Sequence, residues 1–179
     1  MNVNDILNKA LSLLGITDVT VATPSTDERL SRLVNALGVS YMQLITEYAP
    51  LESESSITVS DGSFDLTTLT ENFFDVVRLT DESGKGVKFR LRGRTLIAED
   101  GVYTLRYYRL PSSYPAIGGT VDVPPQITLP LLARGVAAEY ALEALQFEES
   151  ILHERKYKEG LAKVLAPHAA KRISFGKWI

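Results

Sequence analysis

The chain has 179 residues, 45% of them hydrophobic, and a formal net charge of −3. That length and composition suffice for a buried core, built as one domain or as a domain with additions. The sequence holds no cysteine, which excludes disulfides, thiolate metal sites and a cysteine nucleophile, and its slightly acidic balance gives no sign of a general affinity for nucleic acid.

The most apolar run of the chain, residues 129–145, raises the question of a membrane segment. Arg134, Glu139 and Glu143 interrupt it, and it is shorter than the about 20 apolar residues that span a bilayer. The N-terminal stretch has no basic region before its apolar residues, so it lacks the pattern of a signal peptide. We therefore expect no membrane partner.

A short helix is predicted first, over residues 4–14. Its apolar residues recur at helical spacing, Asn4 provides an N-cap, and Gly15 follows at the C-terminal end. We expect this amphipathic helix to pack on the next helix or on a neighbouring element.

A longer helix follows the first. Ser25 and Glu28 have the spacing of a capping box, and an apolar stripe continues to Tyr48 before Pro50 ends the helix. Gly38, in the middle of this stripe, predicts either the close approach of another helix or a small kink.

From residue 56 to residue 110 the hydrophobic period changes from helical to alternating, which predicts short antiparallel strands. Asp61–Gly62, Arg92–Gly93 and Asp100–Gly101 supply tight turns, and the first of them favours positive φ. We predict a meander of strands joined by these turns. In one strand, alternation places apolar side chains on one face and basic ones on the other: Val87, Phe89 and Leu91 against Lys88 and Arg90.

Residues 112–125 are rich in Pro, Gly and Ser and predict an irregular loop. A helix is then predicted from residue 126 or Pro130 to residue 145, rich in small residues that permit close approach by neighbouring backbones. A second helix is predicted over residues 147–165, and we expect Pro167 to end it.

Together these elements predict an α+β protein, in which a helical bundle from the N- and C-terminal helices carries an inserted small antiparallel β-domain. We assign residues 1–50 and 126–166 to the helical bundle. Residues 51–125 form the β-domain with its loop, and residues 167–179 form a C-terminal tail.

The search for catalytic motifs is largely negative. His153 and His168 lie in or after a charged helix with no nucleophile at a diagnostic spacing, which favours solvated side chains. Residues 84–86 resemble a glycine-rich loop but precede no helix, so they do not form a phosphate cradle. We expect no enzyme activity, no metal and no cofactor. An enzyme with a carboxylate site within residues 47–82 remains an alternative.

Basic residues in the β-region are the best candidates for contact with phosphates. This set could contact DNA or a neighbouring subunit, while a solvated strand face is the simpler interpretation: Lys88, Arg90, Arg92 and Arg94. A second set resembles a stacking platform for single strands, although packing in a half-buried strand is the more common use of such tyrosines: Tyr103, Tyr107 and Tyr108 with Arg106 and Arg109.

The order of the elements resembles the head–tail connector (adaptor) proteins of tailed bacteriophages, in the broad group that includes the tail tubular protein A family. A short helix and a long helix precede a small β insertion, whose last strands read RGRTLIAEDGVYTLRYYRLP. A loop, an alanine-rich helix and a second helix follow. The corresponding stretches are Arg92–Tyr108, Pro130–Leu145 and Phe147–Leu165.

The resemblance implies a ring below the portal, commonly dodecameric, that joins capsid to tail and lets DNA pass without sequence-specific binding. It implies a place in the virion neck, in the host cytoplasm during assembly, and a stopper or nozzle protein on the tail side. No catalytic residues are implied. The C-terminal tail would dock into the portal through aromatic anchors and basic residues: Lys171, Arg172, Phe175, Lys177 and Trp178.

The apolar run is then expected to be a bundle helix that packs mostly on the N-terminal helices. A second face of this helix, near Arg134, Glu139 and Glu143, is where we expect the next subunit. The competing hypothesis is a nucleic-acid-binding regulator that uses the basic residues of the β-region.

Overall fold

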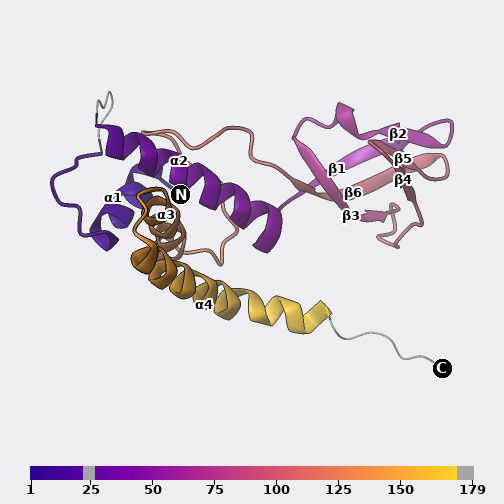
Figure 1. Ribbon diagram of the computed structural model, residues 1–179. Coiled ribbons are helices and arrows are strands. Elements are labelled where there is room, and N and C mark those ends of the chain that lie inside the picture. The colour runs from indigo at the N-terminus through magenta and orange to yellow at the C-terminus, as the bar shows by residue number, and fades with distance from the viewer. Residues whose placement is uncertain (22–26, 173–179) are drawn as a thin grey trace. The chain divides into compact units, whose positions relative to one another are not determined.

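The computed structural model describes residues 1–21 and 27–172, with side chains placed as far as residue 165 in the last helix. The chain divides into two compact units (Figure 1). Met1–Ala49 and Ser113–Ile179 form the helical unit, and Pro50–Ser112 form the β-unit. The predicted α+β class, with a small antiparallel β-domain inserted between helices, is confirmed.

Four α-helices build the helical unit: α1 (Val3–Leu13), α2 (Glu28–Gln43), α3 (Leu129–Glu143) and α4 (Phe147–Arg172). A π-helical turn, η1 (Leu44–Tyr48), extends α2. Helix α3 packs against each of the other three and is buried around most of its circumference, which explains its apolar, alanine-rich sequence.

The helix caps differ from the predicted ones by two residues. The side chain of Asn2, not Asn4, caps α1 by accepting from the Asn4 backbone N–H at 2.8 Å. Asp27 caps α2 by accepting from the Arg29 N–H, while Ser25 lies outside the described residues. Gly15 ends the first helix as predicted, with φ of 68°.

The close neighbour predicted at Gly38 exists, but it is not a helix. A Cβ atom at this position would collide with the ring of Tyr114, which comes from the loop before α3 in the same unit. The glycine therefore makes room for an aromatic side chain rather than for another backbone.

The loop before α3 belongs to the helical unit, so the predicted boundary at residue 125 is wrong. Met1 and Val121 exchange two backbone hydrogen bonds, and the Val3 N–H donates to the Gly119 carbonyl at 3.0 Å. The Tyr41 hydroxyl donates to the Asp122 carbonyl at 2.6 Å. These bonds tie the loop to the N-terminal segment and to α2.

In the β-unit, two three-stranded antiparallel sheets replace the predicted meander. The first has the order β1 (Leu51–Val59), β6 (Gly101–Arg109), β3 (Phe73–Thr80), so the first strand pairs with the last. The second has the order β2 (Ser63–Asp65), β5 (Thr95–Ile97), β4 (Arg90–Arg92).

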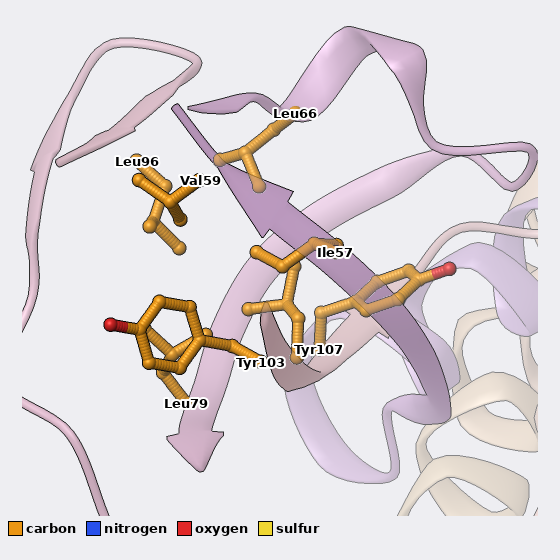
Figure 2. Close-up of a cluster of buried hydrophobic side chains, with 8 residues drawn as sticks. Ile57, Val59, Leu66, Leu79, Leu96, Tyr103 and Tyr107 are labelled. Atoms are coloured by element: carbon orange, nitrogen blue, oxygen red, sulfur yellow. The ribbon is translucent and has the colours of Figure 1, made fainter. Parts of the chain in front are cut away.

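Side chains from both sheets share one core. Figure 2 shows Ile57, Val59, Tyr103 and Tyr107 from the first sheet gathered with Leu96 from the second, and all are buried. The same cluster includes residues of β3 and of the 3-10 turn η2 (Leu66–Thr68): Leu79 and Leu66. One core for two small sheets makes the unit compact despite its short strands.

The turns were predicted better than the pairings. Asp61 and Gly62 both have positive φ, as in a type I′ turn, and Gly93 has φ of 61° at the turn from β4 to β5. The predicted apolar strand face is confirmed only in part, because Val87 and Phe89 pack against the core while Leu91 is 42% exposed.

Candidate subunit interface

Helix α4 is amphipathic in an unusual way, with one buried face and one exposed apolar edge. Its inner face consists of Ser150, His153, Tyr157 and Leu161, all buried. The Ser150 hydroxyl donates to the Ala138 carbonyl of α3 at 3.0 Å. The Tyr157 ring lies over Gly135, where a Cβ atom would be 3.1 Å from Cζ, so glycine permits the close crossing of the two helices.

Pro167 does not end α4, contrary to prediction, because the helix continues to Arg172. Proline removes one backbone donor, which weakens a helix at that point without necessarily ending it.

The turn between α3 and α4 holds a leucine where glycine is the usual residue. Leu145 has φ of 59°; its N–H donates to the Leu142 carbonyl, and the Gln146 N–H donates to the Ala141 carbonyl. This is the Schellman arrangement, in which a left-handed residue closes the helix end. The left-handed conformation is energetically unfavourable for a leucine. The side chain is also 73% exposed, so it contributes little to the core of its own chain.

Four further large apolar residues are exposed around this turn and along the first turns of α4. We call the set the corner patch: Leu142, Leu145, Phe147, Ile151 and Leu152. Scattered apolar side chains are ordinary on a protein surface, but five within eleven consecutive residues are a candidate surface for contact with another protein.

The sequence contained a signal for this patch that the prediction missed. Phe147 and Ile151 are four residues apart, so they lie on one side of α4, and that side differs from the inner stripe that includes Tyr157 and Leu161. An apolar pair outside the core stripe of a helix is the pattern expected of a docking edge.

The predicted interface residues of α3 are exposed to solvent to different degrees. Glu143 is exposed next to Leu142, whereas Arg134 and Glu139 are half-buried. Burial, and then the charges of Glu143 and Glu154, raise the pKa of the Glu139 carboxyl. Burial, and then Arg134, lower the pKa of His153, whose Nδ1 has no hydrogen-bond partner within the described residues. Only Glu143 is a free surface group, so the set does not form a single exposed face.

The predicted basic set is exposed in full. Arg90 and Arg92 lie on β4, Arg94 lies in the following turn, and Lys88 precedes the strand. Within the part of the chain that the structure describes, none of the four side chains forms an ion pair.

The tyrosine and arginine strand is a packing strand. Tyr103 and Tyr107 are buried, and their hydroxyls are hydrogen-bonded to the Glu99 carbonyl and to Glu71 respectively. Arg106 forms ion pairs across the sheet with Glu52 and Glu54 of β1, and Arg109 lies 3.5 Å from a carboxylate oxygen of Glu71. The strand therefore offers no row of free aromatic faces for bases.

The predicted docking tail cannot be placed. Phe175, Lys177 and Trp178 lie outside the described residues, and Lys171 and Arg172 are described only as the backbone at the end of α4.

The features of a chemical site are sparse. Among the described residues there is no group of three or more His, Asp or Glu side chains that could hold a metal ion. In the acidic stretch 47–82, hydrogen bonds from Thr67 lower the pKa of Asp65, and hydrogen bonds from Ser83 and Lys85 lower that of Asp81. These carboxylates order turns, and both shifts run opposite to those of a general acid. No described helix has the length and apolar character needed to cross a membrane.

No family model matches the chain, and no curated protein matches its sequence.

Proposed function

We propose that the chain is a structural subunit of a bacteriophage head–tail connector, which assembles into a ring below the portal and lets DNA pass into the tail. The observation that carries this proposal is the corner patch, because an exposed apolar surface beside a strained leucine is explained by a protein partner. The proposed role is structural, without catalysis or cofactor.

The arrangement of the elements supports the same proposal. The helices come from the two ends of the sequence and the β-unit is an insertion between them, which is the order on which the resemblance to phage connectors rests. A net charge of −3 suits a channel through which DNA slides without being held.

The proposed partners are further copies of the chain, the portal protein, and a stopper or nozzle on the tail side. The corner patch and Glu143 are proposed to contact the neighbouring copy. The tail with Lys171, Arg172, Phe175, Lys177 and Trp178 is proposed to dock into the portal, since large aromatics and basic side chains are frequent anchors at interfaces.

Binding to the portal tests the proposal. The full chain is mixed with purified portal rings of the same phage, and complexes are separated by sedimentation and imaged by electron microscopy. A ring of this chain on one end of the portal is expected. A chain that stays monomeric and never binds portal refutes the proposal.

Two variants sharpen this test. Deletion of residues 171–179 should leave the folding of both units nearly intact and abolish portal binding, whereas a deleted protein that assembles normally contradicts the docking role. Leu145→Ser should weaken assembly at least about tenfold. Val39→Ser is the matched control, because Val39 is a similarly exposed aliphatic residue on α2, outside the corner patch.

A nucleic-acid-binding regulator is the second candidate, favoured by the four exposed basic residues of the β-unit, none of which forms an ion pair with a described residue. It predicts DNA affinity that falls steeply with salt and falls further when Arg90 and Arg92 are replaced by Gln. Absence of DNA binding at low salt removes this candidate. The buried positions of Tyr103 and Tyr107 make it the weaker of the two.

A further inference from the structure

The side of α4 that points away from α3 carries a symmetric pattern of charge. Its inner face, with His153 and Tyr157, packs on α3, and the residues half a turn away from that face are exposed. We call these residues the outward face of α4: Glu148, Ile151, Leu152 and Arg155.

The outward face has an apolar centre between opposite charges. Ile151 and Leu152 are adjacent, Glu148 precedes Ile151 by three residues, and Arg155 follows Leu152 by three residues. The two charges are seven positions apart, which is about two turns of an α-helix, so both project on the same side as the apolar pair.

Within the part of the chain whose side chains are described, these two charges have no counterpart. Among the described residues, neither Glu148 nor Arg155 forms an ion pair, although Glu154 and Lys158 on the flank of the same helix pair at 2.6 Å. An unpaired acid and an unpaired base on either side of exposed apolar residues form a surface that is complementary to itself.

We propose that this face binds the same face of a second copy, with the two α4 helices antiparallel about a two-fold axis between Ile151 and Leu152. In that arrangement Glu148 of each copy is level with Arg155 of the other, and the four apolar side chains meet at the axis. A parallel arrangement in register would instead place like charges side by side, which is unfavourable.

The pairing goes beyond the proposed function and does not depend on it. Both contacts use Ile151 and Leu152, so a copy in the dimer must release this face before its corner patch can contact a neighbour in a ring. A two-fold contact is complete with two copies, whereas a ring needs a head-to-tail contact that repeats around an axis. The dimer is therefore a property of the free protein, and its presence or absence is measured without portal.

Sedimentation velocity of the full chain tests the pairing, at protein concentrations from about 1 μM to about 100 μM. A monomer–dimer equilibrium is expected that weakens between about 0.1 M and about 1 M NaCl, since the screening length falls from about 10 Å to about 3 Å. A monomer at every concentration overturns the proposal, and so does association directly into larger species without a dimer.

Charge reversal identifies the face. Glu148→Arg and Arg155→Glu should each weaken dimerisation about tenfold, because each turns two attractive pairs into repulsive ones. The double variant restores opposite charges at both places and should regain the original affinity within about threefold. Lys9→Glu on α1 is the matched control and should have no effect, because Lys9 is exposed on another helix.

All these positions are exposed, so the fold is expected to persist, and circular dichroism of each variant verifies it. A dimer whose affinity is unchanged by the single reversals overturns the proposal. Failure of the double variant to recover does the same, because only reciprocal contact between Glu148 and Arg155 predicts recovery.

Discussion

Replacing Gly135 by alanine tests the crossing of α3 and α4, on which the position of the corner patch depends. The new Cβ atom would lie 3.1, 3.2 and 3.3 Å from three ring atoms of Tyr157, closer than ordinary van der Waals contact. Tyr157 is buried, so its ring must displace its neighbours to move away. Overpacking of this kind costs about 1–3 kcal/mol, while alanine gains about 1 kcal/mol over glycine in a helix. We expect a net loss of about 1 kcal/mol in the free energy of unfolding.

A double-mutant cycle separates these two effects. In a Tyr157→Leu background the ring is absent, so Gly135→Ala should retain only the helix gain and stabilise by about 1 kcal/mol. Gly160→Ala is the matched control, because its Cβ atom would meet a single methyl group of Leu131, Cδ1 at 2.5 Å, at the end of a flexible side chain. Leu131 is buried, so its rotation should offset the helix gain of about 1 kcal/mol and keep the control near neutral.

Urea unfolding followed by far-UV circular dichroism measures each variant, with the helical signal reporting on the helical unit. Equal slopes against urea concentration would show that only stability has changed. If Gly135→Ala stabilises the parent as much as it stabilises the Tyr157→Leu background, then no ring lies over Gly135 and the reasoning is refuted.

Two further predictions concern the same helical hairpin. Leu145→Gly should raise the free energy of unfolding, measured with urea, by about 0.5–1 kcal/mol. Glycine adopts the left-handed conformation without strain, and this gain should exceed the cost of the greater conformational freedom of the unfolded chain. A destabilised variant would show that the leucine is not strained at this turn. His153 has a lowered pKa in the folded state, so the unfolded state binds more protons, and stability should fall as the pH drops through about 6.5 towards the folded value. Urea unfolding at pH about 7.5 and about 5.5 should show a smaller fall for His153→Gln than for the parent, and equal falls would exclude this histidine as the cause.

Local features of the β-unit could be predicted, but its pairings could not. The turn at Asp61–Gly62 depends on the φ preferences of these two residues, so the four residues of the turn are enough to predict it. The pairing of Leu51 with Arg109 depends instead on residues far apart in sequence. Alternation in β1 and β6 says that each has a buried face, but not which strand lies beside it.

In the helical unit, too, the sequence predicted the elements better than the contacts between them. The alanine-rich sequence of α3 correctly predicted a helix that packs on its neighbours, since its own small and apolar residues occupy most of its circumference. At Gly38 the sequence predicted either a neighbouring helix or a small kink, and the neighbour is instead the ring of Tyr114. A missing side chain indicates space without indicating what fills it. The corner patch was not predicted, because the charges of α3 indicate an exposed face from sequence alone, whereas the exposed apolar residues lie mostly in the turn and on α4.

The pairing of β1 with β6 has a consequence for the folding of the other unit. Leu51 and Arg109 are direct partners, so the chain enters and leaves the β-unit at neighbouring points of one sheet. A folded β-unit then acts as a short connection between the end of the α2 segment and the loop before α3, although it contains residues 50–112. Closing that stretch as an unstructured loop would cost about 2 kcal/mol more than closing a loop of a few residues. The insertion therefore reduces the entropic cost of bringing α3 to α1 and α2, provided that its own strands pair first.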